Sequence, residues 1–275
     1  MVARPLIALI TDYGDSDHYV GAMKGAILAV CPEAEIVDIV HSLPPHDVEG
    51  AAWSLAASFR TFPAGTVFVC VVDPGVGSAR RALAVECNGQ LFVGPDNGLL
   101  TYVLVECGDY RMYSITNWAL MRPQVSATFH GRDVFGPVAA HLARGVPLDE
   151  VGPPAEDPIL FPMQSMRPMG EGEWEATVVS IDRFGNLTTS LYERDLSAML
   201  LQADNDPTEV VVVVGGVVIP LVHAYSDVAE GEACALVGSS GRLEVAVFRG
   251  SAAATLSAVR GTPVRLRVLR IAGGY

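Results

Sequence analysis

The hydrophobic and polar positions divide the chain into two halves with different periodicities. In the first half, short and nearly continuous apolar runs alternate with stretches of helical spacing. The order is LIALIT (6–11), a helical stretch (18–30), EIVDIV (35–40), a helical stretch (47–59) and TVFVCVV (66–72). Strands that are apolar on both faces are typical of a parallel sheet covered by helices. The pattern predicts an α/β domain with a largely parallel central sheet over residues 1–160.

Further elements are expected in this domain after the third strand. Residues 82–86 and 90–94 have the pattern of strands, and residues 99–105 and 134–144 have that of helices. Asp133 stands directly before the last helix and is a candidate N-cap.

The second half has the short alternating runs of an antiparallel β-domain. Strands are expected at 175–182, 186–191, 210–214, 217–221, 233–238, 243–248 and 262–270. Gly215 and Gly216 form a two-residue hairpin between two of them. Prolines and glycines without periodicity place a linker at 161–172, so that residues 173–275 form an all-β, barrel-like domain.

Composition excludes several classes of protein. Of the 275 residues, 50% are hydrophobic and 18% are charged, which indicates a folded globular chain. The formal net charge of −13, with no cluster of lysine and arginine, argues against nucleic acid as a partner. No apolar run is long enough to span a membrane or to act as a signal peptide, so we expect a cytoplasmic protein without membrane attachment.

The cysteines indicate neither a disulfide framework nor a zinc site. They are odd in number, form no CxxC pair and lie mostly in apolar runs. We therefore expect reduced cysteines in the protein core. The residues are Cys31, Cys70, Cys87, Cys107 and Cys234.

Polar residues follow three of the predicted strands. Asp12, His41 and Asp73 stand where strands end, and ligands of open α/β sheets bind beyond the carboxyl ends of the strands. After Asp73 the sequence PGVGSARR predicts a tight turn that brings an arginine back over the carboxylate. An Asx turn or a helix cap explains Asp12 or Asp73 equally well. Arg81 is expected to be a solvated or salt-bridged arginine rather than a functional one.

Two further motifs carry candidate functional residues. His130 precedes Gly131 at the start of a predicted helix, where an imidazole can lie in a cleft beside backbone N–H groups, or can be merely structural. Asp182 and Asn186 flank Phe184 in SIDRFGNLTTS, a turn that can hold an amino-acid-like group or can be an ordinary turn.

Metal and dinucleotide sites are not indicated. The stretch TDYGDSD contains Asp12, Asp15 and Asp17 but lacks the spacing and the glutamate of a calcium-binding loop. GVG at 75–77 lacks the third glycine of a dinucleotide fingerprint. A hydrolytic metal site stays open as the less favoured alternative.

Seven collinear motifs together resemble a known family. They are TDYGDSDHYVGAMKG, HSLPPHDVEGA, VVDPGVGSARRALAVE, VGPDNGLL, TFHGRDVF, IDRFGNLTTS and GRLEVAVFRGSAA. In this order, and over nearly the whole chain, they resemble the adenosine-forming S-adenosyl-L-methionine (SAM) hydrolases. These are also called SAM hydroxide adenosyltransferases and are related to fluorinase and chlorinase.

The resemblance implies that SAM and water become adenosine and methionine without a metal or other cofactor. It implies a homotrimer whose active sites lie between the N-terminal domain of one subunit and the C-terminal domain of its neighbour. Asp12 would hold the ribose hydroxyls. Asp73, Arg80 and His130 would position and activate the water, with Arg80 holding the attacking oxygen and either Asp73 or His130 acting as the base.

The resemblance also implies residues around the substrate. Asp182 and Asn186 would bind the methionine portion, and His46 and Phe184 would line the walls. The backbone of residues 250–252 would meet the adenine. The other residues expected at the substrate are Phe129, Gly131, Ser239, Arg242, Arg249, Ser251 and Ala252. Residues 238–240 and the TTS that ends the FGN motif depart from the pattern of many relatives.

The nucleophile distinguishes the hydrolases from the halogenating relatives. At the end of the third strand, those relatives carry a segment similar to TYPATG. They carry Tyr and Ser where this chain has His130 and Gly131. The presence of Asp73, Arg80 and His130 favours water, which needs help to lose a proton. A SAM-dependent halogenase, a non-catalytic sensor of SAM or nucleosides and a metal phosphoesterase are the alternatives.

Overall fold

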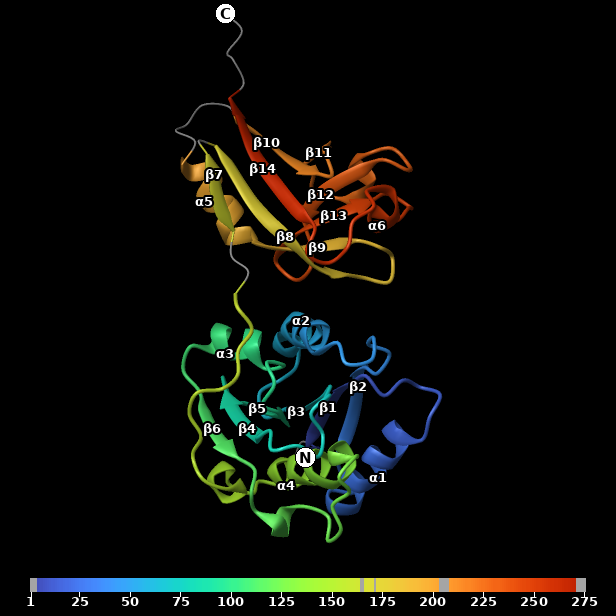
Figure 1. Cartoon of the computed structure of the whole chain (residues 1–275), viewed down its shortest axis with the longest axis vertical. Coiled ribbons are helices and arrows are strands. Elements are labelled where there is room, and N and C mark those ends of the chain that lie inside the picture. The colour runs from blue at the N-terminus through green and yellow to red at the C-terminus, as the bar shows by residue number, and fades with distance from the viewer. Residues whose placement is uncertain (1–3, 164–165, 171, 203–207, 271–275) are drawn as a thin grey trace, which may run out of the picture. The chain divides into compact units, whose positions relative to one another are not determined.

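The computed structural model describes residues 4–163, 166–170, 172–202 and 208–270. The chain forms two compact units, Met1–Phe161 and Pro162–Tyr275 (Figure 1). The first unit contains a sheet with helices on both faces, and the second is built around an antiparallel sheet.

The sheet of the first unit has the strand order β2-β1-β3-β5-β4-β6. β1 pairs in parallel with β2 and β3, and β3 pairs in parallel with β5. β4 runs antiparallel to β5 and β6. The predicted α/β domain with a largely parallel sheet is confirmed, while β6 was not predicted. The bounds are β1 Leu6–Thr11, β2 Glu35–Val40, β3 Val67–Val71, β4 Ala82–Cys87, β5 Gln90–Pro95 and β6 Arg111–Ser114.

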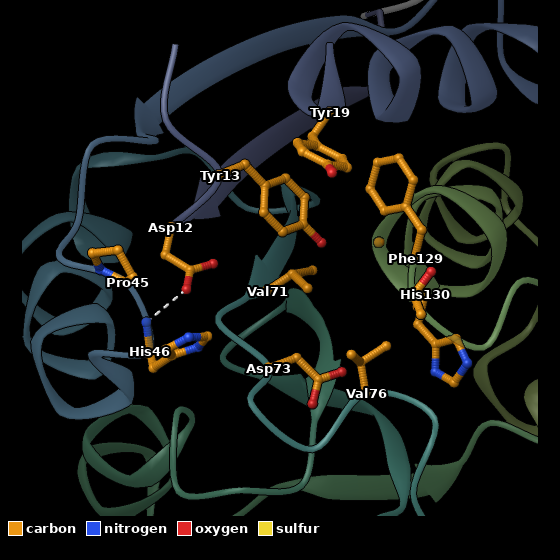
Figure 2. Close-up of a pocket in the computed structure, with 12 residues that line it drawn as sticks. Asp12, Tyr13, Tyr19, Pro45, His46, Val71, Asp73, Val76, Phe129 and His130 are labelled. Atoms are coloured by element: carbon orange, nitrogen blue, oxygen red, sulfur yellow. Dashed lines mark hydrogen bonds between the residues drawn. The ribbon is translucent and has the colours of Figure 1, made fainter. Parts of the chain in front are cut away.

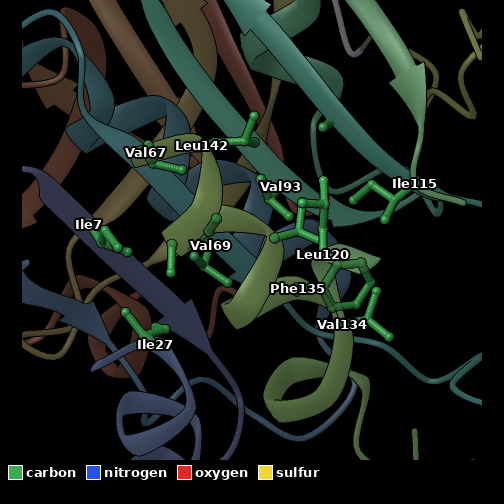
Figure 3. Close-up of a cluster of buried hydrophobic side chains, with 14 of the residues drawn as sticks. Ile7, Ile27, Val67, Val69, Val93, Ile115, Leu120, Val134, Phe135 and Leu142 are labelled. Carbon is green, nitrogen blue, oxygen red and sulfur yellow. The ribbon is translucent and has the colours of Figure 1, made fainter. Parts of the chain in front are cut away.

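Four helices cover the two faces of this sheet, because its strands are apolar on both sides. Ile7 and Leu9 of β1 pack in one buried cluster with α1 and α4, which also holds Val69 and Phe135 (Figure 3). Ala8 and Ile10 point to the other face and pack with residues of α2 and α3. The helices are α1 Tyr19–Val30, α2 Val48–Ser58, α3 Thr101–Cys107 and α4 Gly136–Ala143. No helix in the described ranges is long and apolar enough to cross a membrane.

The predicted N-cap at Asp133 is wrong. Residues Gly131–Phe135 form a π-helical turn that runs directly into α4, so Asp133 lies inside the helical segment. Its side chain is fully buried and accepts hydrogen bonds from the Ser126 N–H at 2.9 Å and from Arg132 Nε at 2.7 Å. These partners, rather than the end of a helix, satisfy the carboxylate.

The expectation that all cysteines are reduced is also wrong. Cys87, at the end of β4, and Cys107, at the end of α3, form a disulfide. Their Cα atoms lie 6.1 Å apart, within the range for such bonds. The sequence contains no short motif that shows this pairing, because the fold brings the two ends together. Cys31, Cys70 and Cys234 are free and buried.

The second unit confirms the prediction of an all-β, barrel-like domain. Its strand order is β11-β10-β14-β8-β9-β13-β12, with every strand pair antiparallel, and β7 pairs with β8. A bridge between Leu221 and Ala235 links the region after β11 to β12 and brings the two edges of the sheet together. The strands are β7 Arg167–Gly170, β8 Glu173–Ile181, β9 Leu187–Tyr192, β10 Thr208–Val214, β11 Val217–Pro220, β12 Ala233–Val237, β13 Arg242–Val247 and β14 Pro263–Arg270.

Several elements in the described part of this unit have no counterpart in the sequence pattern. β7 lies within the stretch expected as a linker, and the helices α5 (Glu193–Gln202) and α6 (Ala252–Thr255) interrupt the series of strands. The hairpin between β10 and β11 was predicted correctly. Gly215 and Gly216 have φ values of 59° and 86°, which side chains other than glycine rarely adopt.

Candidate active site

A cavity of about 290 Å³ lies in the first unit, beyond the carboxyl ends of β1, β2 and β3 (Figure 2). This is the edge at which ligands of open α/β sheets bind. Its walls come from the segments that follow these strands and from the segment that leads into α4. The lining residues are Asp12, Tyr13, Tyr19, Pro45, His46, Val71, Asp73, Val76, Thr128, Phe129, His130 and Gly131.

Asp12 is fixed in this wall by the loop that follows β2. Its Oδ2 accepts a hydrogen bond from the backbone N–H of His46 at 2.8 Å. His46 has a φ of 67°, and this left-handed conformation presents its N–H to the carboxylate. Oδ1 of Asp12 makes no hydrogen bond to any residue in the described ranges, so it can accept one from a ligand.

Asp73, Arg80 and His130 form one hydrogen-bonded cluster. Arg80 Nε lies 3.0 and 3.1 Å from the two carboxylate oxygens of Asp73, and Nη2 lies 2.5 Å from Oδ2. The same Nη2 lies 2.7 Å from His130 Nδ1. The Arg80 side chain is 11% exposed and stands over the ring of Phe135, which holds it behind the wall of the cavity.

This geometry fixes the protonation state of the imidazole. A guanidinium can only donate, so His130 Nδ1 must accept and the ring proton is on Nε2. Burial and the neighbouring positive charge of Arg80 lower the pKa of His130 below its ordinary value. At neutral pH the imidazole is therefore neutral and lies beside the Asp73–Arg80 ion pair.

The glycines after Asp73 allow the loop to approach the segment that carries His130. Gly77 has a φ of 77°, and a Cβ at this position would overlap the carbonyl oxygen of Ala127. Two backbone hydrogen bonds shape the turn, from Val76 N to Asp73 O and from Ser78 N to Gly75 O. A larger residue at position 77 would separate the two sides of the cluster.

Arg81 has a different task from that of Arg80. Its Nε donates to Asp96 Oδ2 at 2.8 Å, and its terminal nitrogens donate to the carbonyl oxygens of Glu156 and Asp157. Of the two expected states, solvated or salt-bridged, the salt-bridged one is thus present, and the hydrogen bonds to the two carbonyl oxygens tie residues 156–157 to the sheet. Arg80 therefore contacts residues that line the cavity, whereas Arg81 stabilises the fold.

Tyr13 lines the cavity and was not selected from the sequence. Its ring packs edge-on against Phe129 and at an angle against Tyr19, with centroid distances of 5.6 and 5.9 Å. Burial, followed by the negative charges of Asp12 and Asp73, raises the pKa of its phenol. In the TDYG motif the carboxylate is the evident functional group, and a tyrosine between an aspartate and a glycine after a strand gives no signal of its own.

Gly131 is required by its contact with Tyr13. A Cβ on Gly131 would overlap the Tyr13 hydroxyl and would lie 3.2 Å from two ring carbons. The neighbouring Phe129 is 6% exposed and also carries Arg132 over its ring. The TFHG motif therefore shapes the aromatic side of the cavity as well as supplying His130.

Three other sequence candidates of this unit, His41, Asp15 and Asp17, are not among the residues that line the cavity. His41 is buried and its Nδ1 lies 2.8 Å from Thr11 Oγ1, while Nε2 pairs with Asp38. It therefore supports the β1 and β2 ends. No group of three His, Cys, Asp or Glu side chains within the described ranges is arranged to hold a metal ion, and this includes Asp15 and Asp17.

In the second unit, Asp182 closes the turn between β8 and β9. Its Oδ1 accepts from the N–H groups of Phe184 and Asn186 at 2.8 and 2.9 Å, and its Oδ2 accepts from Asn186 Nδ2 at 3.1 Å. Phe184 is 75% exposed at the tip. Gly185 packs so closely on Ser251 that a Cβ would overlap its side chain, and Ala253 N donates to Gly185 O.

The structure brings Ser251 and the buried Ala252 beside this turn, because Ser251 caps α6. Arg242 lies at the other end of the β9–β13 pair, where it is buried over the ring of Tyr192 and bonds to its hydroxyl. Ser239 is exposed in the turn between β12 and β13. Arg249 is exposed and pairs with Glu230. Arg242 and Ser239 thus lie at the end of the β9–β13 pair that is away from Asp182, while Arg249 stands two residues before Ser251 in the chain.

The fold and the site define a two-domain α/β and β-barrel protein with a charged cavity at the end of a parallel sheet. Residues 7–152 match the SAM hydroxide adenosyltransferase N-terminal domain, and residues 176–265 match the corresponding C-terminal domain. The chain belongs to the SAM hydroxide adenosyltransferase family.

Relatives cover nearly the whole chain. The (R)-S-adenosyl-L-methionine hydrolase of Salinispora tropica is 40% identical over 98% of this chain and 99% of its own length. The fluorinase of an Actinoplanes species is 31% identical over 88% of this chain and 91% of its own length. The crystal structure of an uncharacterized conserved protein from Thermotoga maritima has 37% identity and a TM-score of 0.88, covering 95% of this chain and 99% of that one.

Proposed function

We propose that this chain hydrolyses SAM to adenosine and L-methionine by attack of water on the ribose 5′ carbon. The observation that carries the proposal is the contact of Arg80 with both Asp73 and His130 at the cavity. The family membership and the name of the Salinispora relative support the same reaction. A charged cluster of this kind suits water as a nucleophile better than a halide ion, which needs a desolvated pocket without a proton acceptor.

In this reaction the nucleophile needs catalytic help and the leaving group does not. The bond from oxygen to the 5′ carbon forms as the bond from that carbon to sulfur breaks, and the electron pair goes to sulfur. Methionine leaves as a neutral thioether, so no general acid is needed. Water has a pKa of about 15.7, and a positioned base contributes about 10²- to 10⁴-fold to the rate. Alignment of oxygen, carbon and sulfur supplies a further part of the acceleration.

We propose Asp73 as the group that takes the proton of the attacking water. His130 Nδ1 already accepts from Arg80, and its other ring nitrogen carries a proton, so the imidazole has no free acceptor in this arrangement. Asp73 lines the cavity, and its carboxylate has lone pairs beyond those that Arg80 uses. Arg80 acts through its two neighbours, which differs from the expectation that it holds the attacking oxygen itself.

The remaining parts of the proposal concern binding and assembly. Asp12 would accept from the ribose hydroxyls through its available oxygen, and Asp182 and Asn186 would receive the methionine portion. We propose a homotrimer in which each cavity is completed by the second unit of a neighbouring subunit, as the family resemblance implies. We also propose that the enzyme is cytoplasmic and uses neither a metal nor an organic cofactor.

Halogenation is the second candidate, because a fluorinase is among the relatives. The test is incubation of purified, metal-stripped protein with each sulfonium epimer of SAM, since the name of the Salinispora relative specifies the R form. Adenosine and methionine are followed by chromatography, with and without chloride or fluoride. The proposal predicts equal amounts of adenosine and methionine without halide or metal. A halide-dependent product would favour the halogenase, and binding without turnover would favour a sensor.

A further inference from the structure

Tyr13 presents a hydroxyl to the cavity that has no partner within the described part of the chain. Figure 2 shows its ring on the wall between Asp12 and Phe129, with the hydroxyl directed into the space above Val71. A phenol hydroxyl at least partly removed from water is normally hydrogen-bonded, because leaving it unsatisfied is unfavourable. We therefore expect an atom of a bound ligand to form this hydrogen bond.

The surroundings hold the Tyr13 hydroxyl in one place. Phe129 and Tyr19 pack against the ring, and the Tyr13 backbone N–H donates to Thr11 Oγ1 at 3.2 Å. On the remaining side the hydroxyl lies 2.3 Å from the position that a Cβ of residue 131 would take, so the absence of a side chain on Gly131 makes room for it. A ligand thus meets a preorganised group that loses little conformational entropy on binding.

The charges beside Tyr13 determine the role of its hydroxyl. Asp12 and Asp73 are the acidic neighbours, and Arg80 is the basic one. Burial and the two carboxylates keep the phenol protonated, so it acts as a hydrogen-bond donor to an oxygen. Asp12 offers an acceptor, Oδ1, in the same wall. A pair of neighbouring hydroxyl groups, as in a ribosyl diol, satisfies both because it can donate to Asp12 and accept from Tyr13.

We propose that Tyr13 is a substrate-binding residue whose hydroxyl donates a hydrogen bond to a ribosyl hydroxyl of the ligand. This inference rests on the proposed function, because it takes the ribosyl group to occupy the cavity beside Asp12. The ribosyl diol would then contact Tyr13 as well as Asp12. The Tyr13 contact also requires Gly131, because a side chain at position 131 would overlap the Tyr13 hydroxyl.

The test is calorimetric binding of adenosine, 2′-deoxyadenosine and 3′-deoxyadenosine to the full chain and to Tyr13→Phe. The matched control is Tyr113→Phe, since Tyr113 is a partly buried tyrosine on β6 that packs against the core of the same unit. Loss of one neutral hydrogen bond weakens adenosine binding by about 3- to 10-fold in Tyr13→Phe, and Tyr113→Phe binds as the wild type. One of the two deoxynucleosides, the one lacking the contacted oxygen, binds both proteins equally.

Three results would overturn the inference. They are unchanged adenosine binding in Tyr13→Phe, equal weakening for adenosine and both deoxynucleosides, and a loss of kcat with unchanged nucleoside affinity, which would place the hydroxyl at the attacking water. Binding does not require turnover. A wild-type protein that binds adenosine but does not cleave SAM would refute the proposed function and leave this inference standing. A wild-type protein that cleaves SAM, with the same nucleoside affinities in Tyr13→Phe as in the wild type, would refute this inference and leave the proposed function standing.

Discussion

Arg80 Nη2 donates to His130 Nδ1 at 2.7 Å while the same guanidinium holds Asp73. One arginine therefore sets the orientation of the carboxylate and the tautomer of the imidazole. Because the donor cannot become an acceptor, protonation of His130 on Nδ1 breaks the contact and places two positive charges together. The proposed activation of water depends on this relationship.

The first prediction concerns the acid limb of the pH profile. Burial and Arg80 lower the pKa of His130, so the neutral ring persists as pH falls until that lowered pKa is reached. We expect kcat/KM to fall on the acid side with a midpoint below the ordinary histidine value of about 6.5. His130→Asn keeps an acceptor near the position of Nδ1 but does not titrate, so the part of this limb that belongs to His130 should disappear. An unchanged midpoint in His130→Asn would assign it to another group.

The second prediction compares the two adjacent arginines. Arg80→Lys removes the forked contact to Asp73 and His130, and we expect kcat to fall about 10²-fold, as for the loss of a positioned donor. Arg81→Lys weakens the clamp on Asp96 and residues 156–157, and should lower the melting temperature while kcat stays near the wild-type value. Steady-state kinetics and thermal unfolding of both variants check this. Equal kcat values for the two variants would contradict it.

The third prediction couples Gly131 to Tyr13. Gly131→Ala places a methyl group on the Tyr13 hydroxyl, and we expect it to destabilise the fold by about 1–3 kcal/mol. Tyr13→Phe removes the overlapping oxygen and leaves ring carbons 3.2 Å from the new Cβ. The loss should therefore be smaller by about 1 kcal/mol in the Tyr13→Phe background. Denaturant unfolding of the four proteins measures this coupling, and additive effects would refute the contact.

The fourth prediction concerns the loop between Asp73 and Arg80. Gly77 and Gly65 both have positive φ, at 77° and 83°, but only a Cβ on Gly77 meets another atom, the Ala127 carbonyl oxygen. Gly77→Ala should therefore destabilise the protein by about 1–3 kcal/mol more than Gly65→Ala, and it alone should lower kcat. Chemical denaturation and steady-state assays of the pair decide this. Similar losses of stability and similar kcat values in the two variants would show that positive φ, and not the contact with Ala127, causes the effect.

The sequence was a good guide where the physical cause is local. The apolar runs of β1 and β3 predict buried parallel strands, and the Asp73, Gly75 and Gly77 pattern predicts a turn that returns an arginine. The alternation in the second half predicts antiparallel strands, and Gly215-Gly216 predicts their hairpin.

The sequence was a poor guide where distant segments meet. The disulfide joins the ends of β4 and α3, and no short motif links Cys87 to Cys107. Asp133 has the sequence position of a cap, but Ser126 and Arg132 satisfy it within a longer helical segment. Tyr13 becomes a candidate only when the fold places it against Gly131, which lies far along the chain.

The most direct measurement of the central claim is hydrolysis of SAM in ¹⁸O-enriched water, with mass spectrometry of both products. Water that is activated at Asp73 and attacks the 5′ carbon places the label in the 5′ oxygen of adenosine and leaves methionine unlabelled. Asp73→Asn, which keeps the shape of the side chain, should form labelled adenosine at least about 10²-fold more slowly, since the variant lacks the proton acceptor. Unlabelled adenosine, label in methionine or an undiminished rate in Asp73→Asn would contradict the account.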